Sequence, residues 1–163
     1  MNYHDIVKDD MLNGEGLRVT LFVAGCSHHC KNCQNPETWD KNSGIKFDAD
    51  AVKEIEEELN KEYISGITLS GGDPLYCGNR ECITELCKYI KDYYPNKTIW
   101  LYTGYRYEEI HNLEVLNYID VLVDGEYQEE NRDIDLQWRG SMNQRIIDVK
   151  ASREQHCIIL YQD

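Results

Sequence analysis

The sequence has no surplus of basic residues, no long apolar run and only three prolines. Lysine and arginine total 17 against 30 aspartate and glutamate residues, which gives a net charge of −13. Binding the phosphate backbone of DNA requires clustered lysine and arginine, so this composition argues against a nucleic-acid ligand. No apolar stretch approaches the roughly 20 residues that cross a bilayer. We therefore expect neither nucleic acid nor a membrane as a partner.

The first residues also lack the apolar segment of a secretory signal peptide, because MNYHDIVKDDML carries acidic residues. We therefore expect a cytoplasmic protein. The seven cysteines are an odd number, and a reducing compartment does not preserve disulfides. The cysteines are therefore expected to divide into a ligand group and a set of packing thiols.

The apolar periodicity alternates between strand and helix, which predicts an α/β fold with a mostly parallel sheet. The length of 163 residues suits one domain, spanning 1–163. The predicted strands are 18–24, 66–72, 98–104 and 118–125, with two further strands at 145–149 and 156–161. The predicted helices pass through 52–63 and 83–94, the second with Asn79 as its N-cap, and a short helix lies near 110–113.

A polar or glycine-containing segment follows each of the first four predicted strands. Three cysteines follow the first strand, GGDP (71–74) the second, TGY (103–105) the third and DGEY (124–127) the fourth. Ligands of open parallel sheets bind beyond the carboxyl ends of the strands. These four segments are therefore expected to meet at one edge of the sheet and to form a ligand site there. The stretches 102–104 and 124–125, which include Tyr102 and Gly125, are expected to line the same cavity.

Cys26, Cys30 and Cys33 form a C-x3-C-x2-C pattern with no fourth cysteine close by. Thiolates are soft ligands that suit zinc, copper(I) or iron–sulfur clusters. Zinc prefers four closed ligands, and His28 or His29 would have to supply the fourth. A non-catalytic zinc-binding interaction module is therefore one hypothesis. A 4Fe–4S cluster held by three cysteines, with one iron open to a substrate, is the other and explains the spacing better.

The cysteine pattern followed by GGDP resembles the radical S-adenosylmethionine enzymes. The branch that it resembles more closely is the activating proteins of the anaerobic ribonucleoside-triphosphate reductases. The similar stretches are 13–39, 66–76, 99–105, 121–127 and 138–145, whereas 146–163 shows no clear match. Glu15, Asn32 and Gln34 depart from residues that are common in the family, but none of these departures removes a cysteine.

The resemblance implies that Cys26, Cys30 and Cys33 bind a 4Fe–4S cluster whose fourth iron chelates S-adenosylmethionine. Reductive cleavage would give a 5′-deoxyadenosyl radical that takes hydrogen from a glycine of the large reductase subunit, and no side chain would act as a catalyst itself. The electron donor would be a protein such as flavodoxin. The fold would be an incomplete β/α barrel, open at the side. An activase of a different glycyl-radical enzyme is the alternative.

The resemblance also implies a set of residues around the cluster. The expected contacts to S-adenosylmethionine are Asn32, Cys33, Gln34, Gly71, Gly72 and Asp73. Among these, the Asp73 carboxylate would help to hold the methionine ammonium. The expected pocket or partner contacts are Thr103, Gly104, Asp124 and Arg139. The remaining cysteines, Cys77, Cys82, Cys87 and Cys157, are interpreted as packing thiols.

Overall fold

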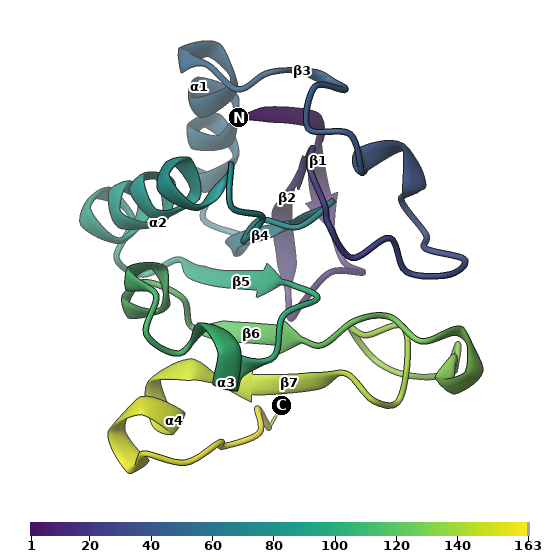
Figure 1. Cartoon of the computed structure of the whole chain (residues 1–163). Coiled ribbons are helices and arrows are strands. Elements are labelled where there is room, and N and C mark those ends of the chain that lie inside the picture. Colours follow the sequence, from purple (N-terminus) through teal and green to yellow (C-terminus); the bar gives the residue numbers. More distant parts are fainter. Residues whose placement is uncertain (163) are drawn as a thin grey trace.

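The computed structural model describes residues 1–162 and has a seven-stranded sheet at its centre (Figure 1). The strands are β1 (Asn2–Asp10), β2 (Leu17–Val23), β3 (Ile45–Lys46), β4 (Ile64–Gly71), β5 (Thr98–Tyr102), β6 (Val121–Asp124) and β7 (Arg145–Asp148). The α-helices are α1 (Ala49–Leu59), α2 (Arg80–Tyr93), α3 (Tyr107–Ile110) and α4 (Val149–Gln155). The short 3-10 helices are η1 (Pro36–Thr38), η2 (Glu114–Asn117) and η3 (Glu129–Asn131). None of the helices in residues 1–162 has the length and apolar character that a bilayer crossing requires.

The strand order in the sheet is β3-β1-β2-β4-β5-β6-β7. The central strands β2, β4, β5 and β6 run parallel to one another. The outer strands β1, β3 and β7 join them in antiparallel pairs. The predicted α/β fold with parallel strands is confirmed, and the sheet is open, with β3 and β7 at its two ends.

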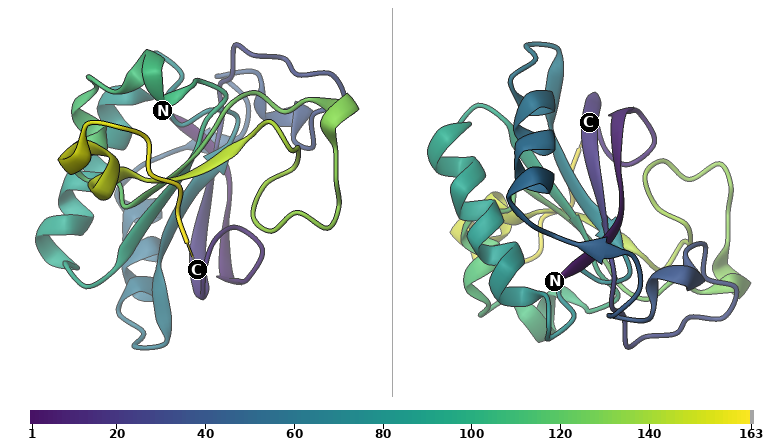
Figure 2. Two further views of the ribbon diagram at one scale, coloured as in Figure 1. Left: turned by 90° about the horizontal axis from the view of Figure 1, so that it is seen from below. Right: turned by 90° about the horizontal axis from the view of Figure 1, so that it is seen from above.

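Two amphipathic helices cover one face of the sheet and leave the other face to long loops. Ile55 of α1 and Ile83 and Ile90 of α2 are buried in the same apolar cluster as Ile67 and Leu69 of β4. Figure 2 shows α1 and α2 on one side of the sheet and the loops that follow β2 and β6 on the opposite side. The main core therefore lies between the helices and the sheet. The opposite face carries the loops that contain the predicted ligand residues.

A buried arginine lies on the sheet near the amino end of β2. Arg18 is 1% exposed, and its guanidinium donates to five neutral oxygens. These are the hydroxyls of Thr68 and Thr98 and the carbonyls of Glu15, Ile67 and Thr98, at 2.8–3.0 Å. Burial lowers the pKa of Arg18 to about 10, so the guanidinium stays charged at neutral pH. Arg18 therefore joins β2, β4 and β5 at the end of the sheet away from the predicted ligand edge.

The predicted central strands and the two long helices are confirmed, with shifts of a few residues at their ends. The predicted strand at 156–161 is wrong, because this segment makes only one isolated bridge, from Leu160 to Ile147. Strand β1 and helix α4 were not predicted. Two register shifts in β1 explain the first omission, because each shift interrupts the two-residue alternation that identifies a strand.

Asn79 occupies the predicted N-cap position of α2 but does not cap the helix with its side chain. Its amide instead donates to the carbonyl oxygens of Ala24 at 2.8 Å and Asp73 at 3.2 Å. Asn79 therefore links the start of α2 to the segments that follow β2 and β4, which are the segments that carry the predicted site.

Candidate functional site

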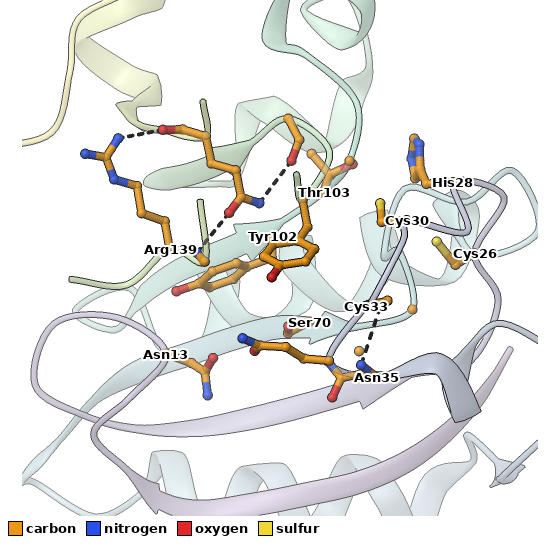
Figure 3. A pocket seen from close by; sticks show the side chains of 18 of the residues that line it. Asn13, Cys26, His28, Cys30, Cys33, Asn35, Ser70, Tyr102, Thr103 and Arg139 are labelled. Atoms are coloured by element: carbon orange, nitrogen blue, oxygen red, sulfur yellow. Dashed lines mark hydrogen bonds between the residues drawn. The ribbon is translucent and has the colours of Figure 1, made fainter. Parts of the chain in front are cut away.

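A cavity of about 440 Å³ opens at the carboxyl edge of the parallel strands (Figure 3). Its wall combines residues that follow β2, β4, β5 and β6, as the positions of the four segments predicted. The predicted residues in the wall are Cys26, Cys30, Cys33, Gln34, Gly71, Gly72, Thr103, Gly104 and Arg139. Figure 3 shows the three cysteines at one end of this cavity and the polar side chains of Asn13, Tyr102 and Arg139 toward the other end.

The three cysteines lie on the irregular loop between β2 and η1, and their thiols are free and partly buried. Backbone hydrogen bonds from Gly25 to the Thr38 carbonyl at 2.7 Å and from Cys26 to the Trp39 carbonyl at 3.1 Å bring the two ends of this loop together. Burial raises the pKa of the Cys26 and Cys30 thiols. Binding a metal would therefore have to displace protons from both thiols.

The glycines of GGDP let β4 end in direct backbone contact with the start of the cysteine loop. Gly71 has a φ of +104°, and a Cβ at this position would lie 2.5 Å from the Val23 nitrogen. A Cβ on Gly72 would lie 2.5 Å from the Gly25 carbonyl oxygen. Side chains at either position would therefore separate the two segments, and glycine is required for packing as well as for any ligand contact.

Asp73 lies behind the cavity wall and is 1% exposed. Its carboxylate accepts hydrogen bonds from the Leu75 nitrogen at 2.8 Å, the Thr103 hydroxyl at 2.9 Å and the Gly104 nitrogen at 3.0 Å. The His28 ring is a fourth partner at 2.8 Å. The predicted contact from Asp73 to a ligand ammonium stays a prediction, and in the structure the carboxylate is bonded to the segments after β2, β4 and β5.

His28 contacts two carboxylates from the middle of the cysteine loop. Its Nε2 lies 2.8 Å from Asp73 Oδ2, and its Nδ1 lies 2.8 Å from Glu126 Oε1. The hydrogen bond to Asp73 raises the pKa of His28 to about 9, although burial opposes this shift. The sequence had suggested His28 only as a possible zinc ligand. Its partners are Asp73 of GGDP and Glu126 of DGEY, and the presence of an acidic residue in both segments is the feature of the sequence that could have indicated them.

The other predicted contacts are divided between the cavity and its surroundings. Arg139 lines the cavity and donates from Nη1 to the Gln144 carbonyl at 2.6 Å. Asn32 is exposed and lies outside the lining, with a φ of +55°. Asp124 is fully buried outside the lining, where it accepts hydrogen bonds from Arg145 and from the Tyr107 nitrogen. Asn32 and Asp124 therefore lie near the site without facing the cavity.

Several cavity residues were not predicted individually, although most of them fall within the stretches that carried the resemblance. They are Leu12, Asn13, Phe22, His28, Asn35, Trp39, Ser70, Tyr127, Leu136, Trp138, Gly140 and Gln144, whereas Tyr102 and Gly125 line the cavity as expected. Tyr102 donates its hydroxyl to the Trp138 carbonyl at 2.8 Å, which ties the 138–145 segment to the end of β5. A position directly before the end of a central strand is the signal that identifies Ser70.

The donor set fits an iron–sulfur cluster better than a single zinc ion. Both nitrogens of His28 are engaged by carboxylates, and the ring of His29 packs edge-on against Trp39 at 4.7 Å. Within residues 1–162, no three histidine, cysteine, aspartate or glutamate side chains form a group suited to a single metal ion. The cavity wall supplies three thiols and no fourth, a soft donor set that suits an iron–sulfur cluster.

The four remaining cysteines lie away from this cavity. Cys87 is fully buried on α2, and burial strongly raises the pKa of its thiol. Cys82 is partly buried, whereas Cys77 and Cys157 are exposed. Their separation from the three loop cysteines agrees with the division into ligands and other thiols, although only Cys87 is a fully buried packing residue.

Comparison with known proteins defines the class first. The model of the 4Fe-4S single cluster domain family matches residues 12–147, so the chain belongs to a family of iron–sulfur proteins. This match replaces the zinc hypothesis.

Three relatives of the chain carry the same printed name, anaerobic ribonucleoside-triphosphate reductase-activating protein. The protein of Enterobacteria phage T4 is 50% identical over 146 residues, which cover 90% of this chain and 93% of the relative. The Vibrio cholerae protein is 43% identical over 150 residues, covering 90% and 97%. The Escherichia coli K12 protein is 44% identical over 148 residues, covering 88% and 96%. The chain belongs to the family of anaerobic ribonucleoside-triphosphate reductase-activating proteins.

Proposed function

We propose that this chain activates an anaerobic ribonucleoside-triphosphate reductase through a 4Fe–4S cluster bound by Cys26, Cys30 and Cys33. The observation that carries the proposal is the presence of these three thiols, and no fourth, in one cavity wall. Cys26, Cys30 and Cys33 would hold the cluster, which would supply one electron from an external donor for cleavage of the sulfonium–C5′ bond of S-adenosylmethionine and so for removal of hydrogen from a glycine α-carbon of the reductase. The chain's own residues have to position these reactants and exclude water.

The cavity has the size and wall that a molecule such as S-adenosylmethionine needs. About 440 Å³ lies within the range of about 300–1,000 Å³ that small-molecule pockets occupy. Gly71 and Gly72 expose backbone at the end of β4, where a zwitterionic amino acid group can approach closely. Gln34 and Ser70 add polar side chains beside them. We assign this end of the cavity to the methionine part of the cofactor.

The far end of the cavity contains two aromatic side chains and an arginine. Tyr102 and Trp138 provide flat apolar surface that suits an adenine ring, and Arg139 provides a positive charge. Thr103 and Gly104 form the wall between the two ends, where the Asp73 carboxylate holds them. Asp73 thus contributes to binding by fixing the loop after β5. Asn32 and Asp124 are assigned supporting positions outside the wall.

The partner proposed for this site is the large subunit of the reductase, which would present its glycine at the cavity opening. An open sheet suits this task, because a partly formed β/α barrel leaves one side accessible to a protein. A flavodoxin-like electron donor and a cytoplasmic location complete the proposal.

Metal analysis of protein purified without oxygen tests the cluster assignment. We expect about four irons and four sulfides per chain and a brown colour. Cys30→Ala is expected to remove the colour, the iron and the cleavage of S-adenosylmethionine. Cys77→Ser is the matched control, because Cys77 is exposed and lies outside the cavity, and it should retain all three. A colourless wild-type protein with one zinc, or an active brown Cys30→Ala variant, would contradict the assignment.

The identity of the partner requires a separate measurement. Activated chain is mixed with the anaerobic reductase or with another glycyl-radical enzyme, and the glycyl radical is measured by electron paramagnetic resonance. We expect a glycyl radical signal when the chain is mixed with the anaerobic reductase and none when it is mixed with the other enzyme. A signal with the other enzyme and none with the reductase would establish the alternative activase.

A further inference from the structure

The middle of the cysteine loop has little backbone support. Its two ends are joined through Gly25 and Cys26, as described above. Across positions 27–32 of the described chain, the only backbone–backbone hydrogen bond is local, from the Cys33 nitrogen to the Cys30 carbonyl at 3.1 Å. His29 also has a φ of +50°, a conformation that most residues avoid. The shape of this segment therefore depends on its side-chain contacts.

His28 makes the strongest of these contacts. Its side chain is 10% exposed, and its two nitrogens each lie 2.8 Å from a carboxylate oxygen, one of Asp73 and one of Glu126. Each ring nitrogen is therefore held by a carboxylate on its own side of the ring. The ring also packs edge-on against Tyr105 at 4.6 Å. Gly104 leaves room for it, because a Cβ there would lie 2.5 Å from the ring.

These contacts come from three different strand ends. Asp73 follows β4, Gly104 and Tyr105 follow β5, and Glu126 follows β6. His28 itself lies two residues after Cys26 and two residues before Cys30. One imidazole ring therefore connects the segment between two proposed iron ligands to the carboxyl ends of three strands.

We propose that His28 is a positioning residue that fixes Cys26 and Cys30 in the arrangement that binds the cluster. The inference rests on the proposed function, because it assumes that these thiols bind iron. No single amide replaces the ring, because the two donors of an asparagine or glutamine lie on one nitrogen and cannot reach carboxylates on opposite sides. Without the bridge, the loop samples conformations in which the two thiols are misplaced.

The rate of iron loss tests this role directly. Wild-type protein, His28→Gln and the control His29→Asn are reconstituted without oxygen, and iron release to a chelator is followed by absorbance. Loss of a supporting partner of a metal ligand costs about 10–100-fold in affinity, so iron loss from His28→Gln should be about tenfold faster or more. His29→Asn should match wild type, because asparagine tolerates the positive φ and His29 contacts neither carboxylate.

Two further readouts separate positioning from general destabilisation. The melting temperature of metal-free His28→Gln should stay within a few degrees of wild type, while the electron paramagnetic resonance lines of its reduced cluster broaden. Glu126→Gln should accelerate iron loss less than His28→Gln does, and the double variant should match His28→Gln, because Glu126 acts through the ring. If His28→Gln does not fold, faster iron loss from Glu126→Gln still supports the bridge, and unchanged loss contradicts it.

The results distinguish the inference from the function on which it rests. If wild type binds no iron, the proposed function fails. If wild type binds four irons and His28→Gln releases them at the wild-type rate, only the role of His28 fails. Independent, multiplicative effects of the His28 and Glu126 substitutions would also overturn the bridge.

Discussion

Replacing Asp73 with asparagine should destabilise the protein, although the two side chains have the same shape. The Asp73 carboxylate is 1% exposed and accepts from the backbone nitrogens of Leu75 and Gly104 on different oxygens. In either orientation, the asparagine NH₂ group would face one of these N–H groups and leave it without an acceptor. A backbone N–H can only donate, so it cannot adapt to a neighbouring NH₂ group.

The expected cost follows from these contacts. A buried donor without a partner costs about 1–3 kcal/mol, and the hydrogen bonds that remain lose the strength that the charge gave them. We therefore expect the free energy of unfolding of Asp73→Asn to fall by about 2–4 kcal/mol. With a urea dependence of about 2 kcal/mol per molar, the unfolding midpoint should fall by about 1–2 M.

Urea unfolding of the metal-free protein under reducing conditions measures this difference. The control is Glu126→Gln, which alters the other carboxylate that His28 contacts. Glu126 is 55% exposed, so its loss should cost about 1 kcal/mol or less. Equal midpoints for Asp73→Asn and wild type would refute the argument that Asp73 organises the loops. A larger fall of the urea midpoint for Glu126→Gln than for Asp73→Asn would refute the argument that the buried carboxylate contributes more to stability than the exposed one.

Three further predictions concern other parts of the chain. Arg18→Met should lower the free energy of unfolding by about 3 kcal/mol, because several buried oxygens lose their donor, and chemical denaturation should detect it. A chelator that strips iron from the loaded protein should abolish cleavage of S-adenosylmethionine, and anaerobic reconstitution should restore it. Arg145 holds the pKa of Glu108 at about 2. The pair therefore stabilises the folded protein fully at any pH above the pKa that this carboxyl has in the unfolded chain, and the stabilisation is lost as the pH falls toward 2. Glu108 is largely exposed, so the pair contributes less than about 1 kcal/mol. Thermal unfolding of Glu108→Gln and wild type between pH 2 and 6 should show that the variant's stability changes less with pH by this amount.

The location of the site could be predicted from the sequence because it follows from strand direction. The cysteines, Gly71 and Thr103 each follow an apolar run, and parallel strands bring the residues after such runs to one edge. The prediction needed only the order of strands and helices, which the spacing of apolar residues gives. It did not need the exact ends of any element, so shifts of a few residues left it intact.

The individual contacts could not be predicted in the same way. Asp73 lies just after β4 and Gln34 lies on the cysteine loop, and both carry polar side chains, but only Gln34 lines the cavity. The direction in which Asp73 points depends on donors from Thr103 and Gly104, which lie about thirty positions further along the chain. Similarly, β1 was missed because its bulges break the alternation that burial normally imposes. Such features depend on pairing between distant segments, which no local pattern contains.

The GGDP segment shows how one short stretch serves packing and function together. Gly71 and Gly72 allow β4 to approach the start of the cysteine loop, and the nitrogens of Gly72 and Asp73 donate to the carbonyls of Val23 and Gly25 at 2.8 Å. The Asp73 carboxylate then holds the next loop and, through His28, the middle of the cysteine loop. A substitution in GGDP would therefore disturb the cluster ligands even if no cofactor touched this segment. Loss of iron in such a variant would report on the loop, and binding of S-adenosylmethionine has to be measured separately in protein that keeps its cluster.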